Sequence, residues 1–270
     1  MISIIIPTLN EEKFLPKLLD SLVAQTKKDF EVIVVDGLSQ DKTVELAHTF
    51  ISKLQNLTVL TSDKASLPLQ RNLGAKHAKG DWLLFIDADS ILLPYSISRI
   101  ETYIEEAHPK FFTTWCRPDT EVQGDAFITL FWNIAIESLK RFKRPMAPGP
   151  LTAVDKATFI LIGGYDEGHA FNEDIDFSLR LDKKGITLQI IRETLYVVSL
   201  RRLRTQGTLH VVQQYTQAAL PVLFFKRSLS YMRGYTMGGQ LYDKKRKRIK
   251  PTVLKQFQTR LTNLMKEFFE

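Results

Sequence analysis

Two aspartates one residue apart, Asp87 and Asp89, follow a run of apolar residues at Trp82–Ile86. Such a run is typical of a strand buried in a sheet, so both carboxylates would emerge where the strand ends. Carboxylate oxygens are the ligands that Mg²⁺ and Mn²⁺ prefer, with substrate phosphates completing the coordination shell. The pair therefore indicates a divalent metal site, although paired aspartates also occur in ordinary turns and helix caps.

Asp36 and Arg71 are the candidates for binding a nucleotide. Asp36 follows a second apolar run, Val32–Val35, and acids at strand ends of nucleotide-binding folds accept hydrogen bonds from a ribose. Its alternative role is to form the turn before Gly37. Arg71 has the planar fork of donors that neutralises a diphosphate. Taken in isolation, it fits an ion pair on a helix surface equally well.

Three further acids, Glu173, Asp174 and Asp176, lie within four residues of one another. The segment predicts the first turn of a helix that ends at Gly185, and acids there favour the positive end of the helix dipole. Asp174 and Asp176 cannot face the same way on a helix. We therefore expect one of them to serve a site and the other to stabilise the helix, unless all three only cap it.

The residues that several other kinds of site require are missing from the sequence. The chain has no hydrolase-like order of Ser, His and Asp, no glycine-rich phosphate loop and no Gly-x-Ser-x-Gly turn. Its single cysteine, Cys116, cannot form an internal disulfide, and no cysteine–histidine spacing is typical of zinc sites. The five histidines are scattered, and we interpret most of them as structural or surface residues.

The elements that must position these side chains alternate between strands and helices. This alternation predicts an α/β fold with a mostly parallel sheet covered by helices on both faces. Ligands of such sheets bind at the carboxyl ends of the strands, which is where Asp36 and Asp87 are expected to meet. The predicted strands are 2–6, 32–35, 57–60, 82–86 and 111–116, and the predicted helices are 14–23, 44–51, 69–78, 126–142 and 173–184.

Positive charge is concentrated at the C-terminal end. The net charge of the chain is +7. Residues 226–270 contain 12 Lys and Arg against 3 Asp and Glu, whereas residues 1–225 contain 25 against 27. The densest run is Lys244–Arg248. Such an asymmetry suggests an anionic partner, either lipid headgroups or nucleic acid.

The N-terminus lacks the basic start of a signal peptide. No apolar run approaches the roughly 18 residues of a membrane span, and the longest, Ala218–Phe225, contains Pro221. We therefore expect a cytoplasmic protein. The apolar helical spacing at 211–225, the basic run and a final amphipathic helix at 253–268 predict peripheral attachment to the cytoplasmic face of an anionic membrane. A solvated appendage or an oligomer contact is the alternative.

Six segments in order resemble family 2 glycosyltransferases, which have the GT-A fold and transfer sugars from nucleotide-diphosphate donors with inversion at the anomeric carbon. The resemblance covers about residues 2–205. It implies a GT-A domain at 1–205 followed by a basic, helical extension at 206–270. The matching segments are Ile4–Glu11, Val35–Gly37 with Ser39, Asp41 and Thr43, Arg71–Ala75, Gly80–Asp89, Gly163–Glu167 and Glu173–Asp176.

The resemblance implies roles for seven residues. Asp174 would be the catalytic base that removes the acceptor hydroxyl's proton. Asp89, with Asp87, would hold Mn²⁺ or Mg²⁺ on the diphosphate. The residues that would bind the donor are Thr8, Glu11 and Asp36 around the nucleoside, Arg71 near the diphosphate or ribose, and Asp87 at the ribose.

The sequence departs from the family in two places. Residues 147–150 stand where many relatives have a glycine-rich segment on the acceptor side, and the Arg-Trp signature of processive members is absent. Arg201 and Arg202 occupy the latter region, and we assign them and Glu173 to phosphate or acceptor binding. The donor is expected to be a UDP-sugar and the acceptor a lipid-linked phosphate or a glycan. The alternatives are a catalytically silent nucleotide-sugar-binding relative, a sugar nucleotidyltransferase and a nucleic-acid-binding protein that uses the basic tail.

Overall fold

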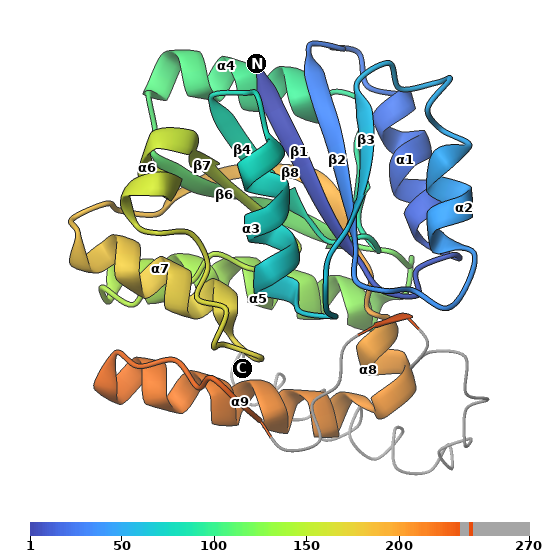
Figure 1. Cartoon of the computed structure of the whole chain (residues 1–270). Helices are drawn as coiled ribbons and strands as arrows, with labels where there is room; N and C mark the ends of the chain where they lie inside the picture. The colour runs from blue at the N-terminus through green and yellow to red at the C-terminus, as the bar shows by residue number, and fades with distance from the viewer. Residues whose placement is uncertain (233–237, 240–270) are drawn as a thin grey trace.

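The computed structural model describes residues 1–232 together with Gly238 and Gly239. Its centre is an eight-stranded sheet with the strand order β3-β2-β1-β4-β7-β6-β8-β5 (Figure 1). The strands are β1 (Ile2–Thr8), β2 (Phe30–Asp36), β3 (Leu57–Thr61), β4 (Trp82–Ile86), β5 (Ile91–Leu92), β6 (Phe111–Pro118), β7 (Leu151–Asp155) and β8 (Gln189–Val198). The α/β class and all five predicted strands are confirmed.

Strands β3, β2, β1 and β4 form a parallel half-sheet. Every residue of β1 and β2 is buried, as expected for β-branched runs covered on both faces. Thr8 pairs with Asp36 in the register of β1 and β2. The carboxyl ends of these strands therefore lie together, at the lower edge of the sheet in Figure 1.

Helices cover both faces of the sheet, as predicted. One face packs against α1 (Leu15–Val23), α2 (Thr43–His48) and α4 (Ser96–Ala107). The other packs against α3 (Leu67–His77), α6 (Lys156–Leu161) and α7 (Glu173–Lys183). Successive residues of β1 point to opposite faces of the sheet. Ile4 and Ile6 pack in the apolar cluster on the first face, and Ile5 packs in the cluster on the second.

The second half of the sheet contains three strands that the sequence does not predict, β5, β7 and β8, and the helices α4 and α6 were not predicted either. Strand β7 runs antiparallel to both β4 and β6, and β8 returns parallel to β6. Strand β7 follows the loop 147–150, so this loop is placed directly beside the carboxyl end of β4. Pro150 accepts a hydrogen bond from the backbone N–H of Asp87 at 3.3 Å.

Three helices lie along the lower edge: α5 (Gln123–Arg141), α8 (Arg201–Gln206) and α9 (Thr208–Phe225) (Figure 1). Val222 of α9 shares an apolar cluster with Ile136 of α5 and with Ile175 of α7. Residues 208–225 thus pack on the preceding part of the chain, while the division into 1–205 and 206–270 stays a prediction. None of the described helices is long and apolar enough to cross a membrane. The basic run at 244–248 and the predicted helix at 253–268 lie outside the described residues.

Candidate active site

The first part of the site is the junction between β1 and β2. Thr8 and Asp36 are buried, and the Thr8 hydroxyl donates to Asp36 Oδ1 at 3.3 Å. Asp36 also accepts from the backbone N–H and the hydroxyl of Ser39, at 2.9 and 2.5 Å. Gln70 of α3 joins the two strand ends, because its amide nitrogen donates to the carbonyls of Thr8 and Val35 at 2.8 and 2.7 Å. These contacts hold the two loops that follow β1 and β2 in fixed positions.

Arg71 is the centre of the second part. Its side chain is 1% exposed and forms ion pairs with Glu173 Oε1 at 2.7 Å and with Asp87 Oδ1 at 3.0 Å. The same guanidinium donates to the carbonyl of Gly149 at 3.2 Å and lies over the ring of Tyr165, 5.1 Å from its centroid. Arg71 thereby connects α3, the end of β4 and the first turn of α7 in one buried network.

Asp174 lies beside this network. Its Oδ2 accepts from the backbone N–H of Gly149 at 2.9 Å, and its Oδ1 from that of Ile175 at 2.8 Å. A Cβ atom at Gly149 would lie 3.3 Å from Arg71 Nη2, 3.4 Å from Asp174 Oδ2 and 3.7 Å from Asp87 Oδ2. Arg71, Asp87 and Asp174 therefore converge at Gly149, where a side chain at this position would crowd the Arg71 guanidinium and the Asp174 carboxylate.

Burial raises the pKa of Asp174 to about 7, and the negative charge of Glu173 adds to the effect. Arg71 and the two backbone donors act in the opposite direction but do not outweigh it. A carboxylate with a pKa near neutrality accepts a proton readily and also releases it at physiological pH. Asp174 has the property that a general base requires.

Asp89, Glu11 and Arg201 form the third part. The Arg201 guanidinium binds both oxygens of Glu11, at 2.7 and 2.5 Å, and its Nε lies 2.8 Å from Asp89 Oδ2. It also lies over the ring of Phe14, 4.4 Å from its centroid. Burial raises the pKa of Asp89 to about 7 and also raises that of Glu11, despite the attraction of Arg201. The segment after α9 reaches this group, since the backbone N–H of Gly239 donates to the carbonyl of Leu9 at 2.9 Å.

The balance of charges in the site indicates whether a divalent cation would fit there. Among the residues that the structure describes, the carboxyl groups of Glu11, Asp87, Asp89 and Glu173 pair with the guanidinium groups of Arg71 and Arg201, and Asp174 lies beside them, so acidic groups are in excess of the arginines that pair with them. A diphosphate would add further negative charge. Asp87 and Asp89 offer the hard oxygen atoms that Mg²⁺ and Mn²⁺ select. The donor set and the excess of charge therefore fit a divalent cation at this pair.

The structure brings most of the predicted site residues together but gives several of them other partners. Arg71 and Glu173, expected to bind phosphate or acceptor, are buried and paired with each other, and Arg201 pairs with Glu11 and Asp89. Arg202 is half-buried on α8. The roles of all these residues in ligand binding stay predictions. Sequence reasoning missed the contacts of Gly149, and a glycine between two prolines was the only signal for it.

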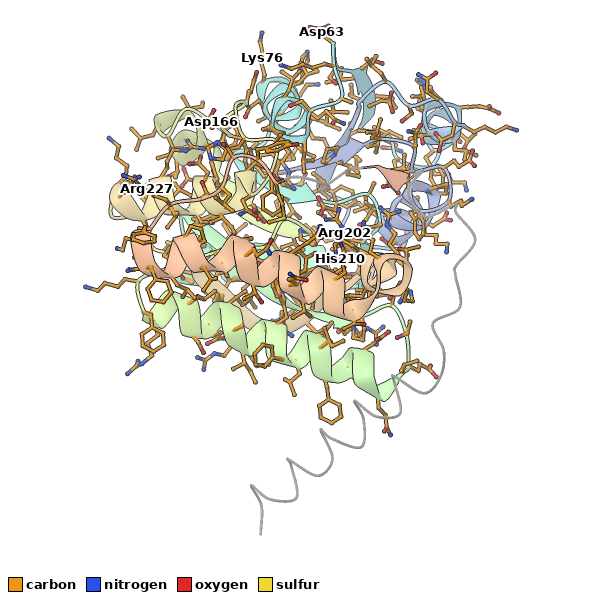
Figure 2. The ribbon with its side chains drawn as sticks, turned by 90° about the horizontal axis from the view of Figure 1, so that it is seen from below. Asp63, Lys76, Asp166, Arg202, His210 and Arg227 are labelled. Carbon is orange, nitrogen blue, oxygen red and sulfur yellow. The ribbon has the colours of Figure 1, made fainter. Side chains whose placement is uncertain are left out.

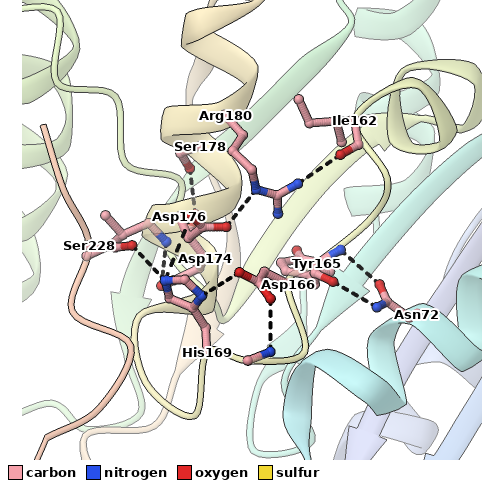
Figure 3. Close-up of polar contacts among 12 residues, drawn as sticks. Asn72, Ile162, Tyr165, Asp166, His169, Asp174, Asp176, Ser178, Arg180 and Ser228 are labelled. Carbon is pink, nitrogen blue, oxygen red and sulfur yellow. Dashed lines mark hydrogen bonds and ion pairs between the residues drawn. The ribbon is translucent and has the colours of Figure 1, made fainter.

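Asp176, in the same turn of α7 as Asp174, points elsewhere, as predicted (Figure 3). It binds Arg180 Nε at 2.6 Å, and its other oxygen lies 3.8 Å from His169 Nε2. His169 Nδ1 lies 3.0 Å from Asp166 Oδ2. The ligand atoms of Asp166, His169 and Asp176 lie within 4.8 Å of one another. Because Arg180 already supplies a cation to Asp176, we interpret this group as an ion-pair network that holds the loop before α7.

Comparison with known sequences identifies the family. The model of glycosyl transferase family 2 matches residues 3–159. An uncharacterized glycosyltransferase of Haemophilus influenzae is 32% identical over 187 residues, which are 67% of this chain and 62% of that protein. The poly(ribitol-phosphate) beta-N-acetylglucosaminyltransferase TarS of Staphylococcus aureus is 36% identical over 110 residues, or 39% of this chain and 19% of TarS. The chain spans less than two thirds of the length of these relatives.

Solved structures agree on the fold. TarS 1–349 of S. aureus in complex with UDP superposes with a TM-score of 0.59 at 21% identity, over 74% of this chain and 60% of that one. The mannosyltransferase PcManGT of Pyrobaculum calidifontis, in complex with GDP-Man and Mn²⁺, superposes with a TM-score of 0.63 at 19% identity, over 82% and 67%. Both have the GT-A fold. Since the family model matches more than half of its residues and its sheet has the arrangement of these enzymes, the chain belongs to glycosyl transferase family 2.

Proposed function

We propose that this protein transfers a sugar from a nucleotide-diphosphate donor to an acceptor hydroxyl, with inversion at the anomeric carbon and with the help of a divalent cation. The observation that carries the proposal is the convergence of two carboxyl groups at Gly149. Asp174, whose pKa is about 7, lies there together with Asp87 at the end of β4. A base close to a carboxylate that can hold a cation is what a single displacement at a sugar carbon requires.

The donor we propose is a UDP-sugar. TarS, which resembles this chain both in sequence and in fold, has been solved with UDP and with UDP-GlcNAc. PcManGT has been solved with GDP-Man, so the choice of base needs a direct test. The fixed loops after β1 and β2, with Thr8, Glu11 and Asp36, are the proposed nucleoside pocket.

Asp87 and Asp89 would hold Mn²⁺ or Mg²⁺. When bound, the cation stabilises the negative charge that develops on the departing diphosphate. Asp89 can offer both oxygens only after Arg201 has released the one it pairs with. Arg71 keeps Asp87 in place, because it ties one oxygen of that carboxylate to the turn that carries Glu173.

Asp174 acts on the acceptor. In its ionised form it accepts the proton of the acceptor hydroxyl while the oxygen attacks the anomeric carbon. The N–H groups of Gly149 and Ile175 fix the orientation of the carboxylate. An attack from the face opposite to the departing diphosphate inverts the configuration at that carbon.

The acceptor we propose is a hydroxyl of a lipid-linked phosphate or of a glycan, in the cytoplasm. The buried, unpaired Cys116 agrees with a reducing compartment. TarS is named for transfer to poly(ribitol-phosphate), whereas the name of the Haemophilus influenzae relative gives no acceptor. A silent relative that only binds nucleotide sugars is the second candidate, and the intact set of Asp87, Asp89 and Asp174 argues against it. A nucleic-acid ligand of the basic tail has no support among the described residues.

Calorimetric titration with UDP, GDP, CDP and dTDP, each with and without Mn²⁺, tests the donor. We expect binding of UDP that Mn²⁺ strengthens. Asp174→Asn should abolish transfer and leave UDP affinity nearly unchanged, while Asp176→Asn, the matched change one residue apart, should retain transfer. The anomeric configuration of the product, read by NMR, tests inversion. Equal transfer by the Asp174→Asn variant would refute the assignment of the base, and UDP binding without turnover of any UDP-sugar would favour the silent relative.

A further inference from the structure

Helix α5 exposes an apolar stripe to solvent. Phe127, Leu130, Phe131 and Ile134 are spaced by three or four residues, so they lie on one face of the helix. Phe127 is 66% and Phe131 74% exposed. The core-facing side of the same helix carries Thr129, Asn133 and Ile136, which are buried. The phenylalanines point away from this side, so α5 has an apolar face that no other described part of the chain covers.

Helix α9 extends this surface. It lies next to α5 in Figure 2, which views the molecule from below. The rings of Trp132 and Tyr215 are 6.1 Å apart, and Arg144 Nε donates to the carbonyl of Leu223 at 3.0 Å. The half-exposed ring of Tyr215 therefore lies on the side of α9 next to α5. We call the exposed apolar residues of both helices the α5–α9 face.

Cations gather at one end of the α5–α9 face. The two contacts just named occur in the same order along both helices, so α5 and α9 run in the same direction and end together. Basic residues gather at both ends: Lys140 and Arg141 form part of the last turn of α5, and Lys143 and Arg144 follow it. Lys226 and Arg227 follow α9, and Lys226 also lies 3.7 Å from Asp182. Among them lie three rings, Phe142, Phe224 and Phe225, each more than 70% exposed.

We propose that the α5–α9 face binds the surface of an anionic phospholipid membrane. Aromatic rings beside Lys and Arg are the composition that favours the boundary between headgroups and acyl chains. The phosphates complement the cations, and the boundary region takes up the rings. The excess of positive charge in residues 226–270 adds long-range attraction to the same surface.

The face is placed suitably for a membrane-bound acceptor. The buried sides of α5 and α9 pack on α7, because Ile136 and Val222 share an apolar cluster with Ile175, which follows Asp174. The carboxyl ends of β1, β2 and β4 point to the same edge of the molecule (Figure 1). This link to the acceptor rests on the proposed function, whereas membrane binding itself does not.

Vesicle flotation of the full chain tests the proposal. The vesicles consist of phosphatidylcholine alone or of phosphatidylcholine with phosphatidylglycerol. We expect flotation with the second kind and its loss at high salt. The double variant Phe127→Ser with Phe131→Ser should bind about tenfold more weakly, since it removes two rings from the contact. The matched control, Ile160→Ser with Leu161→Ser on α6, removes two side chains of similar exposure elsewhere and should float like the wild type.

Three results would overturn the proposal. The first is no flotation of the wild type with either kind of vesicle, and the second is equal flotation of the Phe127/Phe131 variant. The third is a dimer in sedimentation experiments that this variant dissociates without any effect of vesicles, which would make a second copy the occupant. Circular dichroism of each variant shows that it is folded. Because flotation needs no donor or acceptor, its outcome is independent of whether the protein transfers a sugar.

Discussion

The stability of the protein should fall as the pH rises from about 5 to about 7, because two acids of the candidate site keep their protons to a higher pH in the folded protein than in the unfolded chain. The pKa of Asp89 and of Asp174 is raised from 3.8 to about 7. Between these values the folded chain holds two protons that the unfolded chain has released. Stability that depends on these protons is present below pH 3.8 and is lost as the pH rises through 7.

The magnitude follows from the size of the shifts. Each pH unit in this interval removes about 1.4 kcal/mol for each acid, which sets an upper limit of about 5.6 kcal/mol for both acids over two units. Asp89 and Asp174 are partly exposed, and water reduces the effect, so we expect about 2 kcal/mol. The carboxyls with a lowered pKa, such as Asp119 and Glu137, titrate below this interval and do not mask the trend.

Urea unfolding between about pH 5 and pH 7, in a buffer with chelator, measures the effect as a slope of stability against pH. Asp89→Asn and Asp174→Asn should each remove part of the slope, and together most of it. The hydrogen bond that each variant loses shifts stability by a similar amount at every pH, so it does not alter the slope. Stability that is constant or rises over this interval, or a slope that both variants retain, would refute the reasoning.

Three other outcomes test the candidate site. The value of kcat/KM should fall as the pH drops below about 7, because Asp174 must be ionised to accept a proton; a flat profile down to pH 5 would exclude it as the base. Asp89→Ala should weaken UDP binding in Mn²⁺ at least tenfold by calorimetry and leave metal-free binding unchanged, and unchanged affinity in Mn²⁺ would place the cation elsewhere. Arg71→Lys should lower the free energy of unfolding by about 3 kcal/mol. One ammonium group cannot bridge Asp87 and Glu173 as the guanidinium does. A decrease in the free energy of unfolding that lies within the error of urea unfolding would contradict this.

The strands that carry the site could be predicted because their signal is local. Runs such as Ile2–Ile6 and Trp82–Ile86 are almost wholly apolar and rich in β-branched or aromatic residues, and polar residues follow within two positions. Strands β7 and β8 were missed because their pairing depends on distant partners. Residues 151–155 form a strand between β4 and β6, and nothing in five residues of mixed polarity indicates that position.

The types of the site residues were predictable, whereas their partners were not. An arginine near the start of a helix is equally suited to a diphosphate and to carboxylates. The structure places Arg71 in contact with Asp87 and with Glu173, which is 102 positions away. Arg201 and Glu11 are 190 positions apart. Such pairings are decided by how the sheet and its loops pack, which no spacing along the sequence records.

The two arginines of the site differ in how easily they can move. Arg71 is 1% exposed, bridges two carboxylates and packs over Tyr165, so its displacement would leave buried charges without a partner. Arg201 is 13% exposed and belongs to α8, a six-residue helix without a fully buried residue. A cation at Asp89 would compete with Arg201 and not with Arg71. The arrangement thus combines a fully buried arginine that orients Asp87 with a less buried one that a cation would have to displace from Asp89.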